Sequence, residues 1–319
     1  MNPSVSVVIP AYNGASFIRE TLSAIFAQTH PPDEVLIVDD CSTDQIESVV
    51  ASITGESVTP IRFIQLPRNT GTPSKPLNVG ISNAKSEFIL TLDQDDLMRP
   101  RRVEVSLNAL SAFPESGFAI GRFSILGFEE GDLGKVWPTA QFSDICDYID
   151  PAAEFSLLDS KAAFAALLLK NFAGSTSNFC FTKTLWERIG GFDESIKTCV
   201  DLDFILRVVL KSPIVIINEV LFDYRWRESS LNHANTRKTD LELTKVRLSA
   251  ASTRPEWAGE QRLVLEDCAV NAAKLALKHG DLSGLSSMLK TLLTNVEIGT
   301  LLRRRFGRPK DASPVRNAP

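Results

Sequence analysis

The segment Val5-Ser6-Val7-Val8-Ile9-Pro10-Ala11-Tyr12-Asn13 is an apolar, valine-rich run followed by proline and polar side chains. Such a run over residues 5–9 is typical of a buried strand, and Pro10, which has no N–H to donate, is predicted to end it. Residues 14–28 follow with apolar side chains at helical spacing, which predicts a helix packed against the strand. The segment therefore predicts the first strand–helix unit of an α/β fold.

The same alternation of strand and helix continues to about residue 100. Further strands are expected over residues 34–38, 61–66 and 88–92, with helices over residues 44–52 and 75–84 between them. Continuous apolar strands joined by helices are typical of a parallel sheet that is covered on both faces.

The remainder of the chain has a less regular pattern. After Arg99-Pro100 the sequence predicts helices over 101–112 and 157–169, a strand over 117–126, and short strands over 213–217 and 220–226. From about residue 237 onward it predicts mostly helix.

Composition excludes several classes of protein. The chain has 319 residues, 44% of them hydrophobic, and a net charge of −5. This mildly acidic balance argues against nucleic acid as the main partner, because phosphate binding needs a basic face. The first residues carry no basic stretch, and the longest apolar run, residues 162–169, is too short to cross a bilayer. A cytoplasmic location is therefore expected. The five cysteines include no C-x-x-C pair, so neither a disulfide framework nor a zinc site is expected.

Polar side chains follow three of the predicted strands, at residues 10–13, 39–42 and 93–96. Ligands of parallel sheets bind beyond the carboxyl ends of the strands. The segment Asp93-Gln94-Asp95-Asp96 places three carboxylates within four residues, and they repel one another unless a positive group lies between them. A divalent cation, held by one or two carboxylates and the phosphates of a substrate, would relieve that repulsion. The alternative is a solvated acidic turn.

Several motifs, in this order along the chain, resemble the inverting family-two glycosyltransferases with the GT-A fold. They are VSVVIPAYN at residues 5–13, Gln28-Thr29, VLIVDDCSTD at 35–44, NVGISNAKSEFILTLDQDD at 78–96, Gly190-Gly191-Phe192-Asp193-Glu194 and Asp201-x-Asp203. The resemblance covers about residues 4–230. It implies a Rossmann-like α/β fold, with a mostly parallel sheet flanked by helices and a C-terminal helical extension. It also implies an enzyme that moves a sugar from a nucleotide diphosphate donor to an acceptor hydroxyl with inversion.

The resemblance also suggests how the chain is organised. A GT-A domain is expected over residues 1–236, with its nucleotide-binding part at about 1–100 and its acceptor part at about 101–236. Residues 237–302 would form a helical region, and residues 303–319 a flexible tail rich in arginine. The chain has no Q-x-x-R-W motif, which argues against a processive polysaccharide synthase.

On the donor side, the resemblance assigns roles to the residues that follow the first two strands. Pro10, Ala11 and Tyr12 would line the nucleobase pocket, which in this family usually holds uracil. Asp40 would accept the imide N–H of the base. The alternative for Asp40 is to cap the following helix beside Ser42.

The resemblance makes Asp93 and Asp95 the D-x-D motif. Asp95 would bind Mn²⁺ or Mg²⁺, and Asp93 would bind the same metal or face the ribose or the sugar. Lys75 lies where the family often has a basic residue near the donor. It could act as a point charge toward the nucleotide, or it could be a solvated surface lysine.

On the acceptor side, Asp201 corresponds to the catalytic base of the family, which takes the proton of the acceptor hydroxyl. The alternative for Asp201 is a simple acidic residue at a helix N-terminus. This sequence differs from the pattern of the family at two positions. Val200 replaces a frequent glutamate, and Arg227 replaces a frequent histidine and could bind the diphosphate. They prompt a second hypothesis, a catalytically impaired nucleotide-sugar-binding or scaffold protein. A nucleotidyltransferase is a third class, but residues 10–17 lack its glycine- and arginine-rich loop.

The expected partners are a nucleotide-sugar donor and an acceptor that is a glycan, a lipid-linked molecule or a small molecule. The basic tail over 303–319 could contact an anionic membrane at the inner face, or it could simply be solvated. The C-terminal helices could form a homo-oligomer interface or merely cover the core.

Overall fold

The computed structural model describes residues 3–56, 58–127, 145–227 and 236–258, together with residues 270, 273–274, 286 and 289–290. The chain divides into two compact units, Met1–Glu242 and Leu243–Pro319. The first unit contains the sheet and the candidate site. Most of the helical region expected over 237–302, and the whole tail over 303–319, lie outside the described residues.

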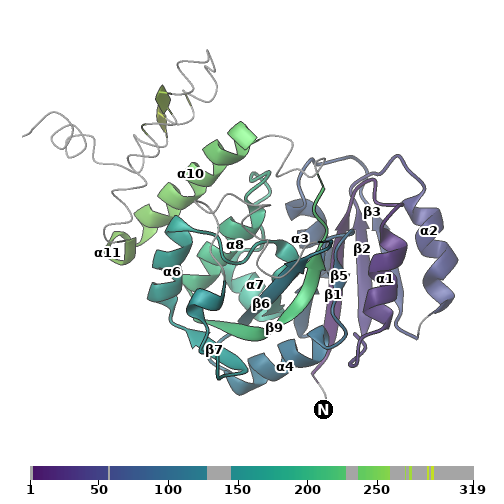
Figure 1. Ribbon diagram of the computed structural model, residues 1–319. Helices are drawn as coiled ribbons and strands as arrows, with labels where there is room; N and C mark the ends of the chain where they lie inside the picture. The colour runs from purple at the N-terminus through teal and green to yellow at the C-terminus, as the bar shows by residue number, and fades with distance from the viewer. Residues whose placement is uncertain are drawn as a thin grey trace, which may run out of the picture. The chain divides into compact units, whose positions relative to one another are not determined.

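Strands and helices alternate over residues 5–91, as the sequence predicts (Figure 1). The strands are β1 (Val5–Ala11), β2 (Glu34–Asp39), β3 (Ile61–Gln65), β4 (Phe88–Thr91), β5 (Leu97–Met98), β6 (Phe118–Ile125), β7 (Phe155–Leu158), β8 (Cys180–Thr182) and β9 (Ile214–Tyr224). The helices are α1 (Ile18–Phe26), α2 (Ile46–Ile53), α3 (Ser74–Asn83), α4 (Arg102–Ala112), α6 (Ser160–Leu169), α7 (Lys183–Ile189), α8 (Val200–Val209), α10 (Thr236–Thr253) and α11 (Pro255–Ala258). None of the helices in these stretches is long and apolar enough to cross a membrane.

The nine strands of the described residues form one sheet in the order β3-β2-β1-β4-β8-β6-β9-β5, with β7 also paired to β9. The four strands β3, β2, β1 and β4 are parallel, so their carboxyl ends meet at one edge. β8 is antiparallel to both β4 and β6, and β9 is antiparallel to β5 and β7. The α/β fold class is therefore confirmed, while the sheet is mixed rather than mostly parallel.

β1 continues one residue beyond Pro10, where the sequence predicted its end. The carbonyl of Val8 accepts from the Leu92 N–H on the β4 side, and backbone groups two residues apart point the same way. The nitrogen of Pro10 therefore faces β4, whose pairing with β1 has already ended at Val8. On the β2 side, the Ala11 carbonyl accepts from the Asp40 N–H at 2.7 Å. No ladder bond is lost at Pro10, so the strand can carry this residue.

Helices cover the two faces of the parallel half. Val5, Val7 and Ile9 of β1 belong to one buried cluster that also includes the apolar faces of α1, α2 and α4. Val8, which points to the opposite face, contacts α3 at Gly80. The arrangement buries the strands on both sides and leaves their carboxyl ends, where the polar residues lie, open to a ligand.

The contact of α3 with the sheet depends on Gly80. A Cβ atom at this position would lie 2.4 Å from Cγ1 of Val8 and 3.1 Å from Cγ2 of Val38. Gly80→Ala is therefore expected to lower the free energy of unfolding by about 1–3 kcal/mol, because α3 must move away from the strands. Urea denaturation followed by circular dichroism measures the change.

Gly55 provides the control for this substitution. It lies in the 3₁₀ turn Thr54–Glu56, and a Cβ atom there would meet nothing within 4 Å. Gly55→Ala should change the free energy of unfolding by no more than about 0.5 kcal/mol. Equal effects of the two substitutions would show that close packing at Gly80 is not what α3 requires.

At the amino end of β2, the buried carboxylate of Glu34 joins three neighbouring elements. It accepts from the Ser6 hydroxyl at 2.8 Å, the Lys85 N–H at 2.7 Å and Arg62 at 3.2 Å. Burial by itself raises the pKa of Glu34, but these donors outweigh it and hold the pKa below its ordinary value of 4.5. The ionised carboxylate therefore stabilises the folded protein.

This shift predicts a pH-dependent contribution to stability. Because the pKa of Glu34 is lower in the folded than in the unfolded chain, the contribution is present above about pH 4.5 and is lost as the pH falls through the folded pKa. Glu34→Gln should lower the free energy of unfolding by about 1–3 kcal/mol at pH 7, and the gap to the wild type should shrink below pH 4. Urea midpoints at pH 7 and 3.5 test this, and a gap that grows on acidification would contradict it.

Candidate active site

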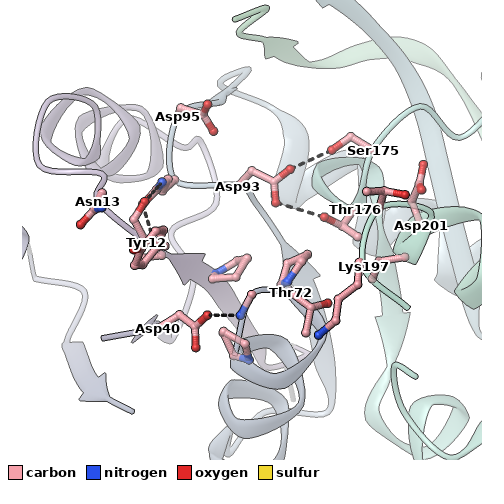
Figure 2. Close-up of a pocket in the computed structure, with 18 of the residues that line it drawn as sticks. Tyr12, Asn13, Asp40, Thr72, Asp93, Asp95, Ser175, Thr176, Lys197 and Asp201 are labelled. Carbon is pink, nitrogen blue, oxygen red and sulfur yellow. Dashed lines mark hydrogen bonds between the residues drawn. The ribbon is translucent and has the colours of Figure 1, made fainter. Parts of the chain in front are cut away.

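A cavity of about 730 Å³ lies at the carboxyl ends of β1, β2 and β4. This is within the range of pockets that enclose a small ligand. Its walls come from two separate parts of the chain, residues 10–95 and residues 175–227. Figure 2 shows Asp40 and Asp201 on opposite sides of this cavity, with Asp93 between them.

The first wall is the segment that follows β1. Pro10 and Ala11 are buried, whereas Tyr12 is 44% exposed. The Gln94 side chain binds the Tyr12 backbone twice: its oxygen accepts from the Tyr12 N–H at 3.0 Å, and its amide donates to the Tyr12 carbonyl at 2.8 Å. Gln94 therefore fixes this wall to the acidic segment after β4.

Asp40 lies in the lining of the cavity and is held by the loop after β3. Its carboxylate accepts from the Thr70 N–H at 3.0 Å, from the Thr70 hydroxyl at 2.9 Å and from the Gly71 N–H at 3.3 Å. The helix-capping alternative places Asp40 beside Ser42, but it is Asp39 whose carboxylate accepts from the Ser42 N–H. An ionised carboxylate has about four acceptor sites, so Asp40 can still accept from a ligand.

The three carboxylates after β4 have three different environments. Asp93 accepts from the hydroxyls of Ser175 at 3.0 Å and Thr176 at 3.1 Å. Asp95 forms an ion pair with Arg227, whose Nη2 lies 2.5 Å from Oδ2. Asp96 points inward, away from the cavity lining, and accepts from a backbone N–H of the chain after β9.

Burial dominates the electrostatics of this acidic segment. Burial, with the charge of Asp95, raises the pKa of Asp93 to about 6. Burial also raises the pKa of Asp95, although the charge of Arg227 opposes it, and the pKa of Asp96 lies well above its usual value. The surroundings therefore disfavour the ionised forms of these carboxylates, and a cationic ligand group beside them would stabilise those forms.

The residues present fit a hard divalent cation that is shared with a substrate. Asp93 and Asp95 both line the cavity, and the buried Oδ2 of Asp96 has no hydrogen-bond partner among the described residues. No group of three or more Cys, His, Asp or Glu side chains in the described stretches is arranged to hold a metal unaided. Two carboxylates completed by substrate phosphates are the usual arrangement for Mg²⁺, so the donor set fits.

The acceptor-side wall is built on the start of α8. Asp201 is the second residue of this helix, is 9% exposed and lines the cavity. The Asn171 amide donates to its Oδ2 at 2.7 Å, which fixes the orientation of the carboxylate. Val200 lies beside it in the cavity wall. Asp203 lies outside the lining, where it pairs with Arg207 at 2.6 Å.

The structure brings most of the residues that the sequence singled out to this one cavity. These are Pro10, Ala11, Tyr12, Asp40, Asp93, Asp95, Asp201 and Arg227. Lys75 is the exception, because it does not line the cavity and its ammonium lies 3.3 Å from the Glu194 carboxylate. Lys197 lines the cavity instead, and its ammonium donates to the Thr70 carbonyl at 3.1 Å.

Sequence reasoning missed Lys197, Gln94 and Asn171, and gave Ser175 and Thr176 no individual role. Lys197 lies four residues before Asp201, which is the one signal that could have pointed to it. The hydroxyls of Ser175 and Thr176 matter only because β8 runs beside β4, a pairing that no local pattern encodes.

The sheet topology agrees with the GT-A fold. Residues 6–138 match the family model Glycosyl transferase family 2.

Sequence relatives agree with this assignment. An uncharacterized glycosyltransferase of Rickettsia typhi is 28% identical over 240 residues, which is 75% of this chain and 68% of the relative. The poly(ribitol-phosphate) beta-N-acetylglucosaminyltransferase TarS of Staphylococcus aureus is 40% identical over 209 residues, which is 65% of this chain but only 32% of TarS.

Solved structures share the fold. TarS residues 1–349 from S. aureus in complex with UDP-GlcNAc superimpose with a TM-score of 0.61 at 18% identity, covering 96% of this chain and 76% of TarS. The mannosyltransferase PcManGT of Pyrobaculum calidifontis, in complex with GDP-Man and Mn²⁺, gives a TM-score of 0.56 at 18% identity, covering 95% and 81%. At these identities the comparison establishes the fold.

Proposed function

We propose that this protein is a metal-dependent, non-processive glycosyltransferase that moves a sugar from a nucleotide diphosphate donor to an acceptor hydroxyl with inversion. The observation that carries the proposal is the meeting of Asp40, Asp93, Asp95 and Asp201, which follow β2, follow β4 and begin α8, around one cavity. The cytoplasm, where sugar nucleotides are made, is the proposed location.

The donor would bind across the parallel half of the sheet. The base would lie against Pro10, Ala11 and Tyr12, with its N–H directed to the free acceptor sites of Asp40. This favours a base with an imide N–H, and a uridine diphosphate sugar is the proposed donor. TarS, which is similar in sequence and fold, was solved with UDP-GlcNAc.

Transfer with inversion is a single displacement. The acceptor oxygen forms a bond to the anomeric carbon while the bond from that carbon to the diphosphate oxygen breaks. Asp201 takes the hydroxyl proton, and the hydrogen bond from Asn171 keeps its carboxylate turned in one direction. The second product is the nucleoside diphosphate.

The negative charge that develops on the leaving diphosphate needs a positive partner. Asp95 and Asp93 would hold a divalent cation, which supplies Lewis-acid stabilisation of that charge when bound. Arg227, beside Asp95, brings a guanidinium that can form charge-assisted bonds to phosphate oxygens.

A screen of nucleotide sugars with Mn²⁺ or Mg²⁺, monitored by release of nucleoside diphosphate, tests the proposal. We expect turnover with a uridine diphosphate sugar and a loss of turnover in the presence of EDTA. The anomeric configuration of the product, read by NMR, tests inversion. Retention of configuration, or turnover that is indifferent to EDTA, would contradict the corresponding part of the proposal.

The ion pair between Arg227 and Asp95 favours one competing hypothesis. Because Arg227 already occupies an oxygen of Asp95, the chain could bind a nucleotide sugar without transferring it. Such a protein would bind UDP in calorimetry yet release no nucleoside diphosphate from any donor and acceptor pair. Turnover of any donor would exclude it.

A further inference from the structure

The segment Lys197–Cys199, just before α8, is held by a side chain from a distant part of the chain. The carboxylate of Glu242, on α10, accepts from three successive backbone N–H groups: Lys197 at 3.0 Å, Thr198 at 2.6 Å and Cys199 at 3.1 Å. It also accepts from the Thr198 hydroxyl at 2.6 Å. One carboxylate thus binds four donors, 43–45 residues away in sequence.

One of these donors, the Cys199 N–H, belongs to the start of α8, where the first backbone N–H groups have no partner within the helix. Cys199 occupies the N-cap position of α8 and makes no side-chain cap hydrogen bond. Glu242 satisfies the backbone there instead, and a negative charge near a helix N-terminus is favourable. Burial alone raises the pKa of Glu242, but the bonds from Thr198 and its neighbours outweigh burial and keep the pKa below 4.5. The carboxylate is therefore ionised at neutral pH.

The segment that Glu242 holds carries two residues of the cavity wall and directly precedes two more, Val200 and Asp201. Lys197 and Thr198 line the cavity, and Asp201 follows two residues after Cys199. Figure 2 shows Lys197 and Asp201 entering the cavity from the same part of the chain. Glu242 itself does not line the cavity.

The same segment is also tied to the donor side. The Lys197 ammonium donates to the Thr70 carbonyl, and Thr70 in turn donates to Asp40. Thr72 donates through its hydroxyl to the Ile196 carbonyl at 2.7 Å. Residues 196–199 therefore lie between the loop that holds the proposed base-binding carboxylate and the helix that carries the proposed catalytic base.

We propose that Glu242 is a positioning residue for the transfer reaction. Its carboxylate fixes residues 197–199, so that Lys197 stays on the nucleotide side of the cavity and Asp201 keeps its orientation toward the acceptor. The expected effect of Glu242 on sugar transfer rests on the proposed function. The restraint that Glu242 places on residues 197–199 is a property of the fold and can be measured without turnover.

Hydrogen exchange, read by mass spectrometry on peptides that cover residues 195–204, tests the positioning directly. In Glu242→Gln the amide of the new side chain faces backbone N–H groups, so protection at 197–199 should fall by at least about tenfold. Peptides from β1 and α3 should be unchanged. Glu242→Asp keeps the charge but is shorter, and its exchange should lie between those of the wild type and Glu242→Gln.

The functional part is read from kinetics and binding. Misplacement of Asp201 should lower kcat of Glu242→Gln by about tenfold to a hundredfold. Misplacement of Lys197 should weaken UDP binding, measured by calorimetry, and Glu242→Asp should recover part of both. Glu47→Gln removes the same charge from an exposed site on α2 and should match the wild type in every measurement.

The outcomes test two claims separately: that Glu242 restrains residues 197–199, and that this restraint matters for the cavity. Unchanged exchange at 197–199 in folded Glu242→Gln would overturn the positioning itself. Faster exchange with unchanged kcat and unchanged UDP affinity would overturn its link to the cavity. If the wild type turned over no sugar nucleotide, the proposed function would fail, and the exchange and UDP-binding measurements would still decide whether Glu242 positions the segment.

Discussion

Asp201→Asn is expected to lower kcat of sugar transfer by about a hundredfold to ten-thousandfold, because an amide cannot take the acceptor proton. Asparagine keeps the shape of the side chain, and its oxygen can still accept the hydrogen bond from Asn171. The cavity should therefore stay intact, and UDP should bind as it does to the wild type. Initial rates of nucleoside diphosphate release and a calorimetric UDP titration give the two readouts.

Asp203→Asn is the matched control on the same helix. Asp203 pairs with Arg207 outside the cavity, so its replacement should lower the melting temperature while kcat stays near that of the wild type. The comparison separates damage to α8 from loss of a proton acceptor. Wild-type transfer by Asp201→Asn would mean that another group takes the proton.

The parallel half of the fold could be predicted because its signals are local. Apolar strands alternate with amphipathic helices, and polar residues follow three of the strands, so one rule about the carboxyl ends of parallel strands brings Asp40 and Asp93 to the same edge. The remainder of the sheet depends on long-range pairing. β8 joins β4 to β6 as an antiparallel strand, and β9 is a single strand over Ile214–Tyr224 where the sequence predicts two short ones.

Side-chain partners in the site were harder to predict than strand ends. The sequence pointed to Lys75 as the lysine near the donor, and only the folded chain shows that Lys75 pairs with Glu194 while Lys197 lines the cavity. The backbone conformation between Gly191 and α8 determines which of the two lysines lines the cavity. The amino-acid composition of a segment does not predict a turn of this kind. The same holds for Glu242, whose role depends on a contact more than 40 residues away.

The acidic segment after β4 shows why its three carboxylates are not interchangeable. Asp93 is restrained by two hydroxyls, Asp95 faces a guanidinium, and Asp96 is buried behind them. Because Asp95 is the one paired with a cationic side chain, it is the carboxylate that can exchange that partner for a metal ion without leaving a buried charge unpaired. Arg227 would then be free to turn toward the diphosphate.

Asp95→Asn should therefore abolish the effect of Mn²⁺ on UDP binding and lower kcat/KM of transfer by at least about a hundredfold, because the charge on the leaving diphosphate loses its partner. The substitution removes a ligand of the cation and also the counter-ion of Arg227, which lies 2.5 Å away. UDP titrations with Mn²⁺ and with EDTA measure the metal-dependent gain in affinity separately from turnover.

Arg227→Gln distinguishes the cation from the ion pair. If Arg227 and the metal compete for Asp95, removal of the guanidinium should leave the Mn²⁺-dependent gain in UDP affinity intact or increase it, even though transfer slows because a phosphate-binding group is lost. A loss of the Mn²⁺ response in both variants would instead mean that the ion pair holds the cavity in its binding shape. A full Mn²⁺ response in Asp95→Asn would remove Asp95 from the metal site.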